Sequence, residues 1–208
     1  MARQLKLGIV MALLSAIAAV GYDVVETMQF FGLIGFPRDA ILISGFSLCI
    51  ATPFMIAMAA FHLAAPPEKQ SWTLPAVVLA GMYATLLSIV YFTELTVTIP
   101  QTLAGHGAAM RDFAFTPHSF FSAIDAIGYV CMSLSTLLAS GALGWRGSSI
   151  WLKAIFIAHG LQAPLIVLTQ CRPEFLLWAS PWLVTGPGSM LLTAVWLARV
   201  PAVDRTPG

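Results

Sequence analysis

The chain has 208 residues, of which 59% are hydrophobic and only 9% are charged. Soluble domains are about 25% charged because they present a polar shell to water, so this composition excludes an ordinary cytosolic enzyme and indicates a membrane protein. A formal net charge of +1 provides no basic surface for nucleic acid, and neither a P-loop nor a dinucleotide-binding glycine motif occurs.

Six apolar stretches are long enough to cross a bilayer as helices, which takes about 20 residues each. Pro, Gly or charged residues mark most of the junctions between them. The predicted spans are residues 7–28, 40–64, 74–99, 119–143, 150–170 and 175–198. They leave no room for a separate soluble domain, so we predict an all-α, polytopic protein with one transmembrane domain over residues 1–208. The first span follows Arg3 and Lys6 as a secretory signal would, but we expect it to stay attached.

The distribution of Lys and Arg predicts that both termini are cytoplasmic, because cytoplasmic loops carry an excess of these residues. This orientation leaves Arg38, Arg111 and Arg172 on the outer side. Seven cations then lie inside: Arg3, Lys6, Lys69, Arg146, Lys153, Arg199 and Arg205. We therefore predict a multi-pass protein of the inner (cytoplasmic) membrane.

The longest predicted connection, residues 101–118, then lies outside. Its apolar Phe113-Ala114-Phe115 could form a lid in the membrane interface, but a plain loop is the more common behaviour of connecting segments. The sixth span contains Pro181 and then Gly186-Pro187-Gly188 near its middle, which predicts a kinked or broken helix. Such a break is compatible with either a transport site or an ordinary proline kink.

One internal match links the two halves of the chain. Residues 15–22 read Ser-Ala-Ile-Ala-Ala-Val-Gly-Tyr and residues 122–129 read Ser-Ala-Ile-Asp-Ala-Ile-Gly-Tyr. A 3+3 inverted repeat, common in secondary transporters, is one interpretation. Chance recurrence of small residues that pack helices closely is the other, and we favour it because the match covers only eight positions.

Polar residues enter the predicted spans in regular stripes. The fourth span carries them at spacings of four, three, four, four and three residues, which places all of them on one helical face that must contact protein. The members of this stripe are His118, Ser122, Asp125, Tyr129, Ser133 and Thr136. Similar polar faces occur on the first, third and fifth spans.

These faces predict a buried polar site that opens outward. An ionisable side chain at the bilayer centre costs about 2.5–3.5 kcal/mol, so each one needs a partner, water or a function. The predicted ligand- or proton-binding residues are Asp23, Glu26, Tyr91, Glu94, Asp125, Tyr129, His159 and Gln162. Since several acids meet few cations at this depth, we expect at least one carboxyl group to hold a proton near neutral pH. The alternative is that the polar groups only bind one another across helices.

The sequence does not decide whether the protein is an enzyme. Glu-x-x-His and His-x-x-x-His pairs are absent, so neither a di-iron nor a local zinc motif is present. A mixed metal site formed by Glu94, His118, Asp125 and His159 remains an alternative by donor type alone. The cofactor is undetermined.

Two segments resemble those of a group of small six-helix bacterial membrane proteins without an assigned activity. They are the run from Tyr91 to Glu94 and the stretch Thr-Pro-His-Ser-Phe-Phe-Ser-Ala-Ile-Asp-Ala-Ile-Gly-Tyr that ends at Tyr129. The resemblance covers the third and fourth spans and implies six helices, but it transfers no catalytic or binding role.

We favour a protein that binds or transports a small molecule or ion through this outward-facing, proton-linked site. A membrane enzyme that acts on a lipid or isoprenoid through the same carboxylates and His159 is the first alternative. A non-catalytic subunit of a membrane complex is the second. The expected partners are the lipid bilayer, a small-molecule, ion or lipid ligand, and either a second copy or other membrane subunits, with no nucleic acid.

Overall fold

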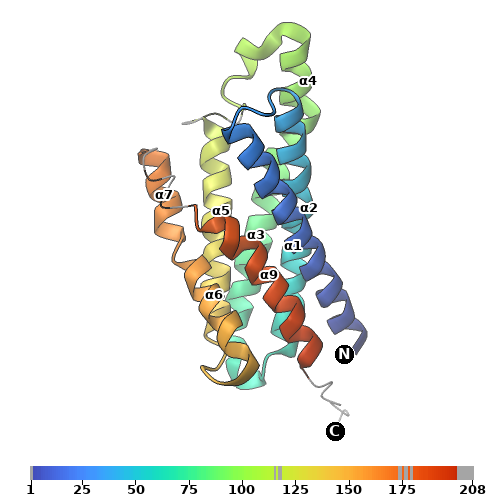
Figure 1. Cartoon of the computed structure of the whole chain (residues 1–208), viewed down its shortest axis with the longest axis vertical. Helices are drawn as coiled ribbons and strands as arrows, with labels where there is room; N and C mark the ends of the chain where they lie inside the picture. The colour runs from blue at the N-terminus through green and yellow to red at the C-terminus, as the bar shows by residue number, and fades with distance from the viewer. Residues whose placement is uncertain are drawn as a thin grey trace.

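In a computed structural model of the chain, the described residues are 2–114, 116, 119–172, 175, 178 and 180–200. All of their long elements are helices (Figure 1). In chain order these are α1 (Ala2–Phe30), α2 (Arg38–Ala64), α3 (Gln70–Thr93), α5 (Phe120–Ser140), α6 (Ile150–Gly160), α7 (Ala163–Cys171) and α9 (Trp182–Arg199). The all-helical prediction is confirmed for this part of the chain.

Five helical segments are long and apolar enough to cross a membrane. They are Leu5–Phe30, Arg38–Ala64, Pro67–Met110, Phe120–Ser140 and Ile150–Cys171. The last of these contains both α6 and α7, and α9 makes a sixth helix of 18 residues. The architecture is therefore that of a multi-pass membrane protein.

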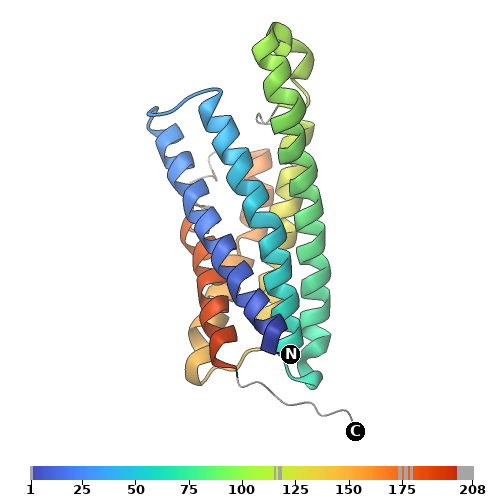
Figure 2. The same ribbon diagram turned by 90° about the vertical axis from the view of Figure 1, so that its right-hand side faces the viewer.

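The helices form an elongated bundle in which α1 begins and α9 ends at the same end of the molecule (Figures 1 and 2). The α1 helix packs against α2 and α9, whereas α3 packs between α2 and α5. The α6 helix contacts α5 and α9, and α7 packs chiefly against α5. Within the described residues, α5 is thus the main neighbour of α7.

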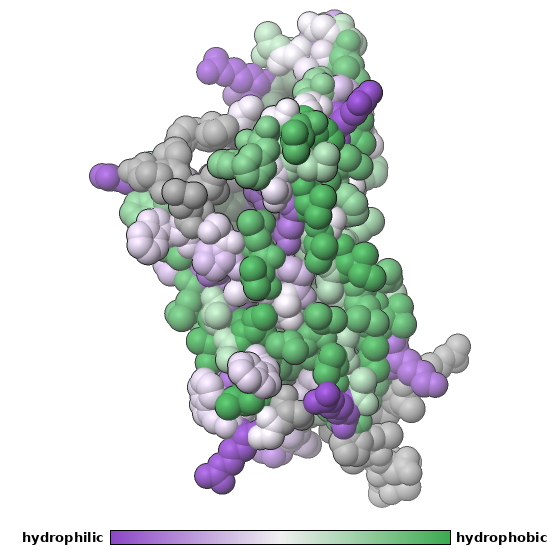
Figure 3. Space-filling view, in the orientation of Figure 1, coloured by the Kyte–Doolittle hydropathy of each residue, from purple (hydrophilic) through white to green (hydrophobic). Residues whose placement is uncertain are grey.

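The polarity of the bundle is opposite to that of a soluble domain. Large apolar side chains such as Ile17 and Val184 are 67% and 71% exposed, while the polar side chains of Ser133, Thr136 and Thr193 are fully buried. Figure 3 shows apolar residues over most of the middle of one face and strongly hydrophilic ones mainly near its two ends. An apolar girdle of this kind matches a hydrocarbon surrounding.

The two matching segments of the sequence use their glycines in the same way. A Cβ atom on Gly21 would collide with the ring of Phe46 in α2, and one on Gly128 would collide with Leu87 in α3. Each glycine therefore lets a neighbouring helix approach closely. The tyrosines that follow, Tyr22 and Tyr129, both contact the ring of Trp182.

The third helix continues well beyond its predicted end at residue 99. It passes through η2 (Glu94–Thr98), α4 (Ile99–Gln101), η3 (Thr102–His106) and η4 (Gly107–Met110), and this extension projects past the other helices (Figure 2). The predicted connection at 101–118 is thus helical up to a kink at Gly105, where φ is +89°, and short helical turns follow as far as Met110. Apolar length marks where lipid ends, whereas helical hydrogen bonding can continue into water. Phe115 lies outside the described residues.

Of the two predicted forms of the sixth helix, kinked or broken, a break at Gly186-Pro187-Gly188 is wrong, because α9 runs without interruption through these residues. A kink there stays a prediction. Pro181 instead precedes the helix as its N-cap residue, where a missing N–H group has no cost. The interruption occurs in the fifth span, at Leu161 and Gln162 between α6 and α7. Pro164 stands in the first turn of α7 and fits this restart.

Candidate functional site

A cavity of about 450 Å³ opens between α1, α5, α7 and the start of α9. In Figure 1, α9 begins only about half-way along the bundle. The described part of α9 therefore does not extend between the upper parts of α1 and α7. The wall includes Tyr22, Glu26, Phe30 and Phe31 of the α1 end, Asp125 and Tyr129 of α5, Ile166 and Gln170 of α7, and Trp182 and Leu183 of α9.

Asp125 is the most deeply buried acid of this wall, with 6% of its surface exposed. Its Oδ1 atom has no hydrogen-bond partner among the described residues. The hydroxyl group of Tyr91 lies beside the carboxylate, and Glu26 lies near enough for the two acids to interact electrostatically. A buried carboxylate with open hydrogen-bonding capacity is costly, so it indicates a bound proton, water or ligand.

The helical stripe of α5 positions Asp125. All of its described members are buried: Ser122, Asp125, Tyr129, Ser133 and Thr136. The Ser119 hydroxyl oxygen accepts a hydrogen bond from the backbone N–H of Ser122 at 3.0 Å and caps the helix. The Ser122 hydroxyl in turn donates to Oε1 of Gln170 at 3.0 Å, which joins α5 to the α7 wall. His118 lies outside the described residues.

Three aromatic rings lie at the inner end of the cavity. The ring of Trp182 meets Tyr22 at a centroid distance of 5.7 Å and Tyr129 at 5.3 Å, both edge to face. The Tyr129 hydroxyl and the Trp182 indole Nε1 are buried without a hydrogen-bond partner among the described residues. The inner wall thus combines apolar ring faces with unsatisfied polar atoms.

His159 and Gln162 lie behind this aromatic group and do not line the cavity. The fully buried imidazole of His159 is 3.1 Å from the Thr185 hydroxyl through Nδ1, and its ring centroid is 6.4 Å from that of Trp182. Its Nε2 atom and Oε1 of Gln162 have no hydrogen-bond partner within the described ranges. His159 therefore neighbours the cavity wall at Trp182.

The remaining predicted site residues have different positions. Asp23 is half-buried on α1 and interacts electrostatically with Glu26, but it is not part of the wall. Tyr91 reaches the site from α3 through its contact with Asp125. Glu94 is 5% exposed, in η2, and does not line the cavity. The structure therefore brings together Glu26, Asp125 and Tyr129, with Tyr91 beside them.

A metal centre finds no support in the described part of the chain. No group of three or more His, Cys, Asp or Glu side chains there could hold a metal ion. The mixed metal site proposed from the sequence includes His118, which is not among the described residues, so that alternative stays untested.

Trp182, like Tyr22 and Gln170, lines the cavity but was not among the predicted site residues. Tryptophans near helix ends suggest interface anchors, and Trp182 follows Pro181 at such an end. The available signal was the Pro-Trp pair, since a proline at a helix start fixes where the following side chains point. With α9 expected to begin at residue 175, Trp182 was expected within a helix and not at its first turn.

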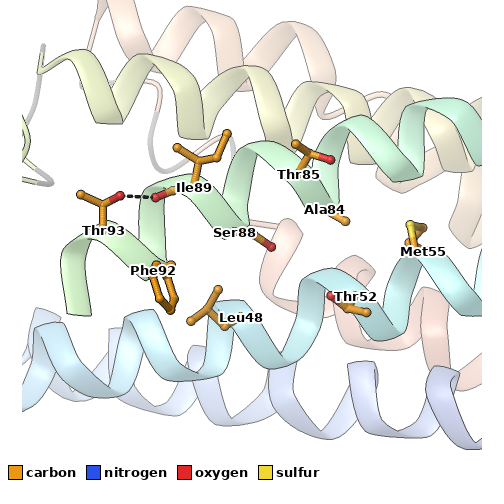
Figure 4. A pocket seen from close by; sticks show the side chains of 9 residues that line it. All are labelled: Leu48, Thr52, Met55, Ala84, Thr85, Ser88, Ile89, Phe92 and Thr93. Carbon is orange, nitrogen blue, oxygen red and sulfur yellow. Dashed lines mark hydrogen bonds between the residues drawn. The ribbon is translucent and has the colours of Figure 1, made fainter. Parts of the chain in front are cut away.

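A second hollow, of about 750 Å³, lies between α2 and α3 (Figure 4). Its lining residues include Leu48, Met55, Ser88 and Phe92 and contain no ionisable side chain. The Thr93 hydroxyl donates to the carbonyl of Ile89, in its own helix, at 2.7 Å. This open apolar groove has no group that could carry out proton or charge chemistry.

No protein-family model, curated protein or solved structure matches this chain. The resemblance of the Tyr91–Glu94 run and of the stretch ending at Tyr129 to small six-helix bacterial membrane proteins stays a prediction.

Proposed function

We propose that this multi-pass protein of the cytoplasmic membrane binds a small solute or ion in the cavity between α1, α5, α7 and α9, and moves it across the membrane in exchange for protons. The observation that carries this proposal is Asp125, which lines the cavity, is 6% exposed and keeps Oδ1 without a hydrogen-bond partner among the described residues. A carboxylate in that position can hold either a proton or a ligand group, and competition between the two couples their movements.

The proposed orientation has both termini in the cytoplasm. Lys69 and Lys153 lie near the end where α1 begins, and Trp145 there is 59% exposed. The Lys153 ammonium donates to the carbonyl of Leu143 at 2.9 Å and lies 4.7 Å from the Trp145 ring centroid. Cations and tryptophans together are typical of a cytoplasmic interface. The cavity then opens in the outer half of the membrane.

Carbodiimide labelling tests the proposed role of Asp125. Dicyclohexylcarbodiimide reacts with protonated carboxyl groups in apolar surroundings, and peptide mass spectrometry identifies the modified residue. We expect Asp125 in the purified full-length chain to be labelled, with Glu26 as a second site. Labelling should decrease as the pH rises, because the ionised carboxylate does not react.

The matched control is Asp39, which is also buried, at 8% exposed, but accepts a hydrogen bond from Nε2 of Gln29 at 2.9 Å and lies outside the cavity wall. Asp125→Asn should remove the modification, and Asp39→Asn should leave it unchanged. Absence of labelling at Asp125 over the whole pH range, or equal labelling at Asp39, would show that Asp125 has a structural role only.

Transport itself is tested in proteoliposomes that contain a trapped pH-sensitive dye. Cationic, neutral and anionic solutes are added in turn, and we expect one class to change the internal pH with the unaltered chain but not with Asp125→Asn. No pH change with any class would contradict the transport part of the proposal.

A further inference from the structure

The charges of the cavity wall are of one sign. Glu26 and Asp125 contribute carboxylates, while no Lys, Arg or His side chain belongs to the described wall. Arg172 is exposed where α7 ends, two residues beyond Gln170, and is not part of it. A low-dielectric cavity with only acids repels anions and favours cations.

Unsatisfied polar atoms belong to the same wall. Asp125 and Tyr129 are 6% and 9% exposed, and both Oδ1 of Asp125 and the Tyr129 hydroxyl are without a hydrogen-bond partner among the described residues. Buried polar atoms in native proteins are almost always hydrogen-bonded, so these two atoms have the capacity to bind a ligand or water that enters the cavity. The Tyr129 hydroxyl adds a neutral polar group to the two carboxylates of the wall.

The aromatic rings beside the acids suit a particular kind of cation. Trp182 stands at 70° to the ring of Tyr22 and at 89° to that of Tyr129, so the three rings do not stack face to face. In each of these edge-to-face pairs the edge of one ring covers one face of the other, and all three rings belong to the cavity wall. Aromatic rings in a binding site attract organic cations through the ring quadrupole, as in the aromatic cages that bind quaternary ammonium groups. Strongly hydrated inorganic ions prefer oxygen ligands instead.

The size and the rim of the cavity indicate an apolar ligand body. A volume of about 450 Å³ is that of a drug-sized molecule and far exceeds that of a single inorganic ion. Ile166 and Leu183 contribute apolar surface to the wall, and Phe30 and Phe31 at the end of α1 are 76% and 68% exposed. A ligand with hydrophobic groups therefore finds apolar contacts from the rim to the inner wall.

We propose that the ligand is a hydrophobic organic cation, such as a protonated or quaternary amine. The positive charge of the ligand lies against Asp125 and Glu26. Its alkyl or aryl groups contact Trp182, Tyr129 and Ile166. This inference rests on the proposed function, because it assigns a ligand class to the same cavity.

The test compares two ions of the same shape and opposite charge, tetraphenylphosphonium and tetraphenylborate. Radiolabelled forms are equilibrated with the full-length chain in mild neutral detergent. We expect saturable binding of tetraphenylphosphonium, competition by benzyltrimethylammonium, and no saturable binding of tetraphenylborate. Equal binding of both ions, or binding of neither, would overturn the inference without recourse to any variant.

Variants then locate the binding. Asp125→Asn should weaken tetraphenylphosphonium binding by about tenfold or more, because it removes a charge from a low-dielectric site. Trp182→Leu, which keeps an apolar side chain, should weaken it by about threefold to thirtyfold through loss of the cation–π contact. Asp39→Asn should bind as the unaltered chain does. Circular dichroism and size-exclusion profiles confirm that each variant is folded, and unchanged binding by folded Asp125→Asn contradicts the inference.

Carbodiimide labelling distinguishes failure of the proposed ligand class from failure of the proposed function. Protection of Asp125 from labelling by tetraphenylphosphonium supports both. A second outcome is that Asp125 is labelled, tetraphenylphosphonium does not slow the labelling, and no binding is detected. The ligand class is then wrong, whereas the proposed function is retained. If Asp125 is not labelled at all, the proposed function falls and the ligand class falls with it.

Discussion

At the scale of single residues, this protein combines small side chains that bring helices together with a few polar ones that face a cavity. Gly128 and Tyr129 are neighbours in α5, yet the first allows α3 to pack closely and the second contributes to the cavity wall. Asp125, one turn earlier, shares the polar face with Tyr129. A single turn of helix thus contains both a packing position and a position in the cavity wall.

The glycine at the end of α6 gives a prediction about stability. A Cβ atom on Gly160 would collide with Cβ of Leu137 and lie 3.0 Å from its Cα atom, so rotation of the leucine side chain cannot relieve the contact. We expect Gly160→Ala to lower the free energy of unfolding by about 1–3 kcal/mol. Thermal unfolding in detergent, followed by circular dichroism, measures the change.

Gly81→Ala is the matched control, because no atom lies within 4 Å of the position that its Cβ would occupy. This variant should unfold at the same temperature as the unaltered chain or slightly above it, since alanine favours helix more than glycine does. Equal melting temperatures for the Gly160 and Gly81 variants would show that α5 and α6 are not in close contact.

At the scale of helices, apolar length predicted where the spans lie but not where the helices end. The predicted spans 40–64 and 150–170 agree closely with Arg38–Ala64 and Ile150–Cys171. The predicted end at residue 99 is too early because α4 and the first part of η3 continue the helix through Gln101 and Thr102 up to the kink at Gly105. A hydropathy pattern records the surroundings of a helix, whereas backbone hydrogen bonds set its length.

The candidate site was predictable only in part, because a sequence pattern shows which face of a helix is buried but not which other helices lie beside it. The period of the polar residues on α5 placed Asp125 and Tyr129 on one buried face, as observed. The distances between helices are not encoded in any local pattern, so the sequence could not tell that Glu94 and His159 would lie outside the cavity wall. The role of Trp182 in the cavity wall could not be predicted, because it depends on α9 beginning at this residue. The apolar pattern continues over residues 175–198 and gives no sign of that start.

The unbroken course of α9 gives a prediction at this scale. Pro187 lies inside the helix, and nearby hydroxyl groups bond to backbone carbonyls, with Ser189 donating to Gly186 and Thr193 donating to Ser189 at 2.7 Å each. If no functional break exists here, Pro187→Ala should fold with equal or higher melting temperature and bind tetraphenylphosphonium as before. Lost binding in a stable Pro187→Ala protein would indicate that the proline itself is needed for function.

At the scale of the whole molecule, the arrangement of the bundle gives a prediction about topology. The extension around Ala108 and the turn at Glu68 lie at opposite ends of the molecule (Figure 2). In a background with Cys49, Cys131 and Cys171 replaced by serine, we expect Ala108→Cys to react with a membrane-impermeant maleimide in intact cells. Glu68→Cys should react only after the membrane is permeabilised. Lys and Arg cluster at the end of the molecule where Glu68 lies, which favours a cytoplasmic position for that end.

The reverse pattern of labelling would place the termini outside and the cavity in the inner half of the membrane. Reaction of both cysteines in intact cells would show that the segment between them does not cross the bilayer, and the membrane architecture itself would then be wrong.

The weak attachment of α7 has a consequence for how selective the cavity is. This helix follows the turn at Leu161 and Gln162, packs chiefly against α5 and contributes Ile166 and Gln170 to the cavity wall. A short helix that follows a turn and packs chiefly against one other helix can move outward with little change in the rest of the bundle. If the cavity binds a ligand as we propose, displacement of this one short helix would let it accept molecules of different size beside the same two carboxylates.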